Sequence, residues 1–201
     1  ASAGLNLNVD HYRVVGPEWS WGPADSPLVL DTRAAGVRPE EFEIVERRGC
    51  DIAPVDAADP DNARYLTSFV WPWQLDRHER LAAALAIAAE HPVTVDRAPA
   101  AAWLAEQLTE PAGDVLTVVW QSITEQYWPA SESAAVRQVV TKARGRMPLA
   151  HLSMEGVPPT QTSGGYDVSR DGPQVRLNGD FLGRTHHHGP PIALAGQGAH
   201  E

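Results

Sequence analysis

The feature that most constrains the fold of this chain is an apolar run from Val115 to Trp120 (VLTVVW). A run without polar alternation is typical of a parallel strand that is buried on both faces. Parallel neighbours need long connections, usually helices, and these helices cover the sheet. We therefore expect this run to be a central strand of an α/β sheet.

Four helices are predicted around this strand, each from a start signal followed by apolar residues at helical spacing. They start near Asp59, Asp76, Pro99 and Ser131. In the first, Asp59 is the N-cap and Pro60 takes the first helical position. In the second, Asp76 and Glu79 form a capping-box-like pair. The fourth is expected to end before Gly145.

Shorter strand candidates alternate with these helices. They are Glu43 to Arg48, Val93 to Asp96, Leu149 to Met154, Tyr166 to Ser169 and Val175 to Leu182. The last two flank a turn signal, Arg170 to Pro173, which predicts an antiparallel hairpin. We expect a doubly wound, mixed but mostly parallel sheet with helices on both faces and this hairpin at its C-terminal end. One domain over residues 1–185 and a tail over 186–201 are predicted.

Charge and cysteine content exclude several classes of protein. The 201 residues carry 16 basic and 26 acidic side chains, a net charge of −10. This balance lacks the basic footprint of a nucleic-acid binder and the basic helix of an anionic-membrane binder. Cys50 is the only cysteine, so an internal disulfide is impossible and a reducing compartment fits. We expect a cytoplasmic protein with a small-molecule ligand or a protein partner.

The N-terminus holds the first candidate site. Ser2 and Gly4 precede an apolar stretch with a helical start. Small residues there suit a strand-to-helix turn whose backbone N–H groups approach a ligand. Small residues at a chain end are also common without any such role, so both interpretations stay open.

Two carboxylates follow predicted strands. Asp51 lies in the pattern Gly-x-Asp-x-x-Pro, and Asp96 ends the strand that begins at Val93. An acid at the carboxyl edge of a parallel sheet accepts hydrogen bonds from ribose hydroxyls in dinucleotide-binding folds, and the second acid suits an adenine amino group. The alternative is that Asp51 caps a turn before the helix at Asp59, and that Asp96 is an ordinary acid before a helix.

A polar loop after the apolar strand is the third candidate. It contains Gln121, Ser122, Glu125, Gln126 and Tyr127. Ligands of open α/β sheets bind beyond the carboxyl ends of the strands, so these side chains form a candidate substrate-facing set. A solvated loop without function is the competing interpretation. No metal is expected, because the adjacent side chains of His186 to His188 diverge on an extended strand.

The order of these motifs resembles class I S-adenosylmethionine (SAM) methyltransferases, which have a Rossmann-like fold. The resemblance implies that the turn with Ser2 and Gly4 holds the methionine part of the cofactor. It also implies that Asp51 binds the ribose and Asp96 the adenine, and that the loop from Gln121 faces the methyl acceptor.

Nearly the whole chain also resembles a bacterial, mainly actinobacterial family known as domain of unknown function 2332. The matching stretches are Ser2 to Leu7, Glu46 to Asp51, Ser68 to Pro72, Asp96 to Leu104 and Val118 to Tyr127. This resemblance adds weight to the fold and names no activity.

Two departures from the methyltransferase pattern bear on function. The strand that precedes the glycine turn in that family has no counterpart before Ala1, so a fragment, an upstream segment or a second copy of the chain is expected to account for it. Gln121 stands where a histidine is expected in many relatives, and glutamine cannot act as a base. Two hypotheses follow. The first is a SAM-binding methyltransferase-like protein of unknown acceptor, whose activity as a truncated chain stays open. The second is a non-catalytic Rossmann-like module that binds a protein partner or another nucleotide.

Overall fold

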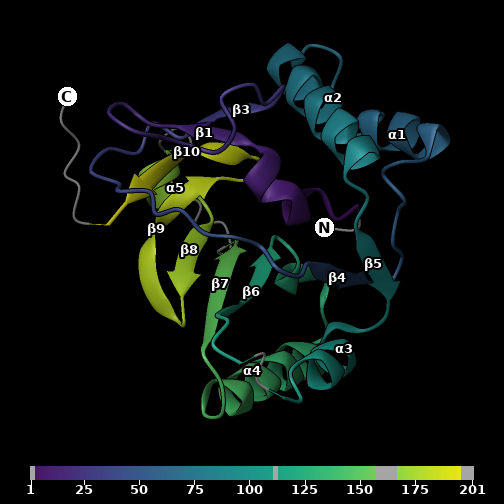
Figure 1. Ribbon diagram of the computed structural model, residues 1–201, viewed down its shortest axis with the longest axis vertical. Coiled ribbons are helices and arrows are strands. Elements are labelled where there is room, and N and C mark those ends of the chain that lie inside the picture. Colours follow the sequence, from purple (N-terminus) through teal and green to yellow (C-terminus); the bar gives the residue numbers. More distant parts are fainter. Residues whose placement is uncertain (1–2, 111–112, 157–166, 196–201) are drawn as a thin grey trace. The chain divides into compact units, whose positions relative to one another are not determined.

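The computed structural model describes residues 3–110, 113–156 and 167–195, and its elements are labelled in Figure 1. It combines helices with three small sheets, so the prediction of a mixed α/β fold is confirmed. The chain divides into two compact units, Ala1–Pro99 and Ala100–Glu201. Within the described ranges, no helix combines the length and the apolar character needed to cross a membrane.

The first unit contains a three-stranded sheet, a two-stranded sheet, a 3-10 helix before them and two α-helices between the strands of the second sheet (Figure 1). The three-stranded sheet has the order β2-β1-β3. The elements of the first unit, in chain order, are the 3-10 helix η1 (Leu5–His11), β1 (Arg13–Val15), β2 (Ser20–Trp21), β3 (Val29–Asp31), β4 (Arg48–Asp51), α1 (Pro60–Thr67), α2 (Leu75–Glu90) and β5 (Thr94–Arg97).

Strands β4 and β5 form a separate parallel pair. They are parallel because α1 and α2 lie between them in the chain and return it to the same end. The prediction placed the first of these strands at Glu43 to Arg48, which is wrong, since β4 starts only at Arg48. The residues from Glu43 to Arg47 have no partner strand among the described residues, and the Val45 side chain is exposed.

The helix starts of this unit were predicted with mixed success. Asp59 is the N-cap of α1, where its carboxylate accepts hydrogen bonds from the backbone N–H groups of Asp61 (2.7 Å) and Asn62 (3.3 Å). In contrast, α2 starts at Leu75 after Gln74, so the capping-box prediction for Asp76 is wrong. Asp76 lies in the first turn instead, where a carboxylate favours the positive end of the helix dipole.

The second unit is built on a five-stranded sheet with the order β10-β9-β8-β7-β6 (Figure 1). Helices α3 and α4 pack against each other and against β6 and β7 through one apolar cluster that includes Leu104, Val119, Val136 and Leu149. The elements are α3 (Ala100–Gln107), β6 (Thr117–Ser122), η2 (Glu125–Tyr127), α4 (Ala130–Arg144), β7 (Leu149–Glu155), α5 (Val168–Asp171), β8 (Gln174–Leu177), β9 (Asp180–His186) and β10 (Gly189–Leu194).

The expectation of one mostly parallel sheet is corrected by the strand pairings. In the five-stranded sheet β6 and β7 are parallel, because α4 connects them, while the pairs β7–β8, β8–β9 and β9–β10 are antiparallel. The two-residue connections from β8 to β9 and from β9 to β10 permit only antiparallel neighbours, whereas the longer connection from β7 to β8 contains α5.

The predicted central strand is at an edge. Among the described residues β6 has β7 as its only strand neighbour, and Val118 and Trp120 are 56% and 39% exposed. The expectation of burial on both faces is therefore wrong for β6.

The C-terminal antiparallel hairpin is present, but it consists of different strands from those predicted. Val168–Asp171 is the short helix α5, so the strand predicted over Tyr166 to Ser169 is wrong where the structure describes it. The strand predicted over Val175 to Leu182 is interrupted by Asn178 and Gly179, with φ of 57° and 96°. These angles suit a two-residue hairpin turn, which joins β8 to β9. Part of the predicted tail forms β10, which pairs with β9.

Candidate functional site

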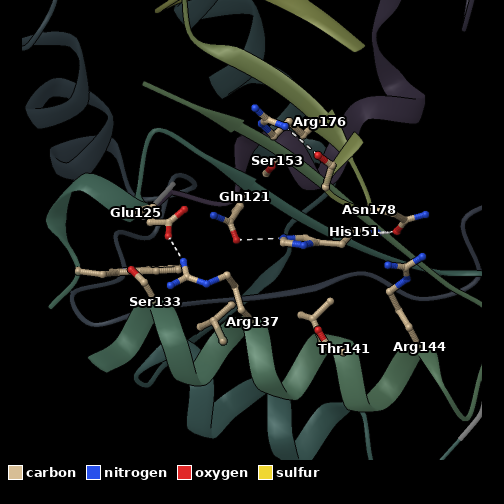
Figure 2. Close-up of a pocket in the computed structure, with 14 residues that line it drawn as sticks. Gln121, Glu125, Ser133, Arg137, Thr141, Arg144, His151, Ser153, Arg176 and Asn178 are labelled. Atoms are coloured by element: carbon tan, nitrogen blue, oxygen red, sulfur yellow. Dashed lines mark hydrogen bonds and ion pairs between the residues drawn. The ribbon is translucent and has the colours of Figure 1, made fainter. Parts of the chain in front are cut away.

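The second unit contains a cavity of about 280 Å³ between α4 and one face of the sheet (Figure 2). It lies along β6, β7 and β8 and ends at the turn between β8 and β9. The polar side chains that line it are Gln121, Glu125, Ser133, Arg137, Thr141, Arg144, His151, Ser153, Arg176 and Asn178.

The strand register explains why these side chains meet. Gln121 pairs with Ser153, and Ser153 pairs with Arg176 on the next strand. Residues paired across neighbouring strands point to the same face, and alternate residues of one strand share it, so His151 joins Ser153 there. On α4, Arg137, Thr141 and Arg144 recur at helical spacing and face the same space.

Gln121 is the centre of a hydrogen-bond chain. Its Nε2 donates to Glu155 Oε1 at 3.0 Å, and its Oε1 lies 3.1 Å from His151 Nε2. Because an amide oxygen only accepts, His151 carries its proton on Nε2 in this arrangement. The Glu155 carboxylate also accepts from the backbone N–H groups of Thr124 and Glu125, at 3.1 and 3.2 Å.

Burial shifts the pKa values of both ends of this chain. The pKa of His151 is lowered, mainly by desolvation and further by the Arg144 cation, while Glu125 opposes the shift. His151 is therefore neutral at pH 7. Desolvation raises the pKa of Glu155, and the hydrogen bonds from Gln121 and the backbone act against that rise.

Three guanidinium groups line the cavity, and each has different partners. Arg137 forms an ion pair with Glu125 at 2.6 Å. Arg176 donates to uncharged acceptors, the side-chain oxygen of Gln174 and the carbonyl of Gly179. Arg144 has no hydrogen bond or ion pair with any residue that the structure describes, and it extends from α4 toward His151 and Asn178 (Figure 2).

The predicted substrate-facing loop contributes only part of this site. Gln121 and Glu125 line the cavity. Ser122 is not among the lining residues, because it follows Gln121 on β6 and points to the other face. Gln126 and Tyr127 are exposed in η2, and Tyr127 is 77% exposed.

The sequence interpretation missed most of the cavity. It did not select His151, Arg144, Arg176 or Asn178. A signal was present in the predicted strand Leu149 to Met154, where His151 and Ser153 occupy alternate positions among apolar residues. The arginines of α4 were not selected, because sequence periodicity does not distinguish a cavity wall from an ordinary polar helix face.

The other candidate residues lie in the first unit, at the β4–β5 pair. Cys50 pairs with Asp96, and Asp51 pairs with Arg97. Both predicted carboxylates are therefore at the carboxyl edge of the pair but project from opposite faces. Asp96 shares its face with Arg48, with which it forms an ion pair at 2.7 Å. The Asp51 carboxylate accepts a hydrogen bond from the Ala53 backbone at 2.8 Å.

The glycine turn lies against the Asp51 face of this pair. Gly4 has φ of 62°, and a Cβ added there would lie 2.7 Å from Cγ2 of Val95. Leu7 approaches Gly49 of β4 from the same side. The structure thus places Gly4 and Asp51 on one face of β4–β5 and Asp96 on the other. Ser2 lies outside the described residues. No group of three or more His, Cys, Asp or Glu side chains suited to a metal occurs in the described part of the chain.

These features define a mixed α/β protein with a polar cavity and a parallel strand pair that ends in two acids. The chain matches a family model over residues 1–193, and the family is described as an uncharacterized protein conserved in bacteria, domain of unknown function 2332. The chain belongs to this family. No curated protein and no solved structure matches it.

Proposed function

We propose that this protein has a methyltransferase-like, Rossmann-like ancestry and binds S-adenosylmethionine at the carboxyl edge of β4 and β5. The observation that carries the proposal is the parallel register of these strands, which brings Asp51 and Asp96 to the same edge. Parallel strands joined by helices bind nucleosides beyond that edge.

The residues at this edge fit a nucleoside in part. Asp51 shares a face with the Gly4 turn, so in this proposal a ribose hydroxyl binds the carboxylate while the methionine part lies near Gly4. Asp96 fits the adenine less well, because it lies on the other face and is paired with Arg48. Gly4 itself is explained by its close packing on Val95. The proposal is therefore one of binding, with Asp51 as its main residue.

Calorimetric titration of the whole chain with S-adenosylhomocysteine tests this proposal. We expect binding, and we expect Asp51→Asn to weaken it about tenfold or more, since a hydrogen bond to a charged group contributes about 1.5–3 kcal/mol. Asp56→Asn is the matched control, because the Asp56 carboxylate accepts from the backbone two residues on, at 2.9 Å, as Asp51 does.

Two results would contradict the proposal. Absence of any heat of binding at millimolar ligand would remove the cofactor. Equal binding by wild type and Asp51→Asn would show that Asp51 does not bind the ribose. The nucleoside would then bind somewhere other than the β4–β5 edge.

A non-catalytic module is the second candidate function, and β6 favours it. This edge strand exposes Val118 and Trp120, and an unpaired apolar edge is a template for a further strand. In this alternative the protein acts by binding a partner, a second copy of the chain being the simplest one. Its test is the oligomeric state of the protein in solution.

A further inference from the structure

The cavity beneath α4 has a charge opposite to that of the whole protein. The chain carries a net charge of −10, yet Arg137, Arg144 and Arg176 line the cavity and Glu125 is the only carboxylate among its lining residues. Arg137 and Arg144 are exposed on the α4 side of this cavity, while Arg176 is half-buried on the sheet side. Cations that lie close together repel one another, and an anion bound between them relieves that repulsion. A cationic cavity in an acidic protein therefore indicates an anionic ligand.

Two of the three arginines, Arg144 and Arg176, are not neutralised by a carboxylate among the described residues, so their charge is available to such a ligand. Glu125 neutralises Arg137 at 2.6 Å. Arg176 is held by the Gln174 side chain at 2.6 and 3.0 Å and by the Gly179 carbonyl at 2.8 Å, and none of these acceptors carries a charge. Arg144 has no partner among the described residues. The held geometry of Arg176 lowers the entropy cost of binding.

Neutral donors and acceptors surround these two guanidinium groups. Ser153 and Asn178 lie on the sheet side and Thr141 on the helix side (Figure 2). The volume of about 280 Å³ is at the lower end of the usual range for ligand sites. A small metabolite fits that volume better than a nucleotide does.

We propose that the cavity between α4 and the β6–β8 face binds a small organic oxyanion, a phosphate ester or a carboxylate, with Arg144 and Arg176 as its charged anchors. Arginine presents a planar set of N–H donors that binds either group through paired hydrogen bonds. This site lies within the second unit alone, so it does not rest on S-adenosylmethionine binding at β4–β5.

The test uses the whole chain, with inorganic phosphate and malonate as two separate probes at constant ionic strength. Calorimetry and thermal unfolding are measured for each. We expect saturable binding of at least one probe and a rise of the unfolding temperature. Tighter binding of phosphate assigns a phosphate ester, and tighter binding of malonate assigns a carboxylate.

Charge-matched variants separate a built site from general attraction. Arg144→Gln is expected to weaken binding tenfold or more. Lys142→Gln removes the same charge from the same end of α4, but Lys142 does not line the cavity, so binding should change less than twofold. Arg144→Lys keeps the charge and loses the planar donors, and it should recover only part of the affinity.

A second variant keeps the proposal testable if Arg144→Gln does not fold. Ser153→Asp places a carboxylate inside the cavity, where it should abolish anion binding without removing an arginine. The proposal is overturned if neither probe binds at tens of millimolar, if Lys142→Gln weakens binding as much as Arg144→Gln does, or if Ser153→Asp leaves binding unchanged.

Discussion

At the scale of single residues, the Gln121 side chain links β6 to β7 in the wall of the cavity. Its amide has a donor and an acceptor, so it can bind the Glu155 carboxylate and the protonated Nε2 of His151 at the same time. A histidine at position 121, as expected in many relatives, would meet the same two neighbours with a group that titrates. Glutamine does not titrate, so the hydrogen bonds made by residue 121 in this protein do not depend on the protonation of that residue.

His151 should make stability depend on pH. Its pKa in the folded protein is lowered below 6.5 by burial, so the unfolded chain binds this proton more readily. The stability that it contributes is present above pH 6.5 and is lost as the pH falls through the lowered pKa. We expect His151→Gln to lose less unfolding temperature than wild type between pH 7 and pH 5.

The measurement is thermal unfolding across that pH range, with His187→Gln as control because His187 is exposed. Glu155 acts in the opposite direction, since its raised pKa removes stability as the pH rises, but it is the same in all three proteins. If the unfolding temperatures of wild type and His151→Gln fall equally with pH, burial does not lower the pKa of His151.

At the scale of elements, the sequence predicted helices well where a local signal decides their start. Asp59 caps α1 as expected because its carboxylate reaches backbone groups two residues on. The strands were harder, since their pairing depends on distant segments. The Asn178–Gly179 turn was a local signal, and overlooking it merged β8 and β9 into one predicted strand.

Gly4 fixes how η1 packs on β5. A side chain there would require a left-handed residue, which costs about 1–2 kcal/mol, and would place Cβ 2.7 and 2.9 Å from the methyl groups of Val95 and Val93. We expect Gly4→Ala to lower the free energy of unfolding by about 2 kcal/mol or more, measured by urea denaturation.

Gly145→Ala is the matched control for this change. Gly145 has φ of −73° at the end of α4, and a Cβ there would lie 3.5 Å from its nearest neighbour, so alanine fits without strain. If both substitutions cost the same free energy, the packing of the Gly4 turn is not what requires glycine.

At the scale of the whole molecule, the sequence predicted the class of fold but not the division of the sheet. The parallel pairs β4–β5 and β6–β7 are both joined by helices, as alternating strand and helix patterns imply. The apolar run around β6 indicated burial, whereas the structure leaves Val118 and Trp120 exposed. An apolar run in the sequence indicates that a strand is to be covered, but it does not identify the segment that covers it.

If a second copy of the chain covers that edge, self-association follows from symmetry. Two β6 strands related by a two-fold axis pair as antiparallel edges, which satisfies their backbone groups and brings Val118 and Trp120 of both copies together on one face of the joined sheet. We expect light scattering after size exclusion to show a mass that rises from one chain to two with concentration.

Val118→Lys should keep the protein at the mass of one chain, because lysine on an edge strand disfavours pairing. Ile52→Lys, which changes an equally apolar side chain that is 74% exposed outside β6, should still dimerise. A mass of one chain at every concentration, or loss of association in both variants, would exclude pairing through β6.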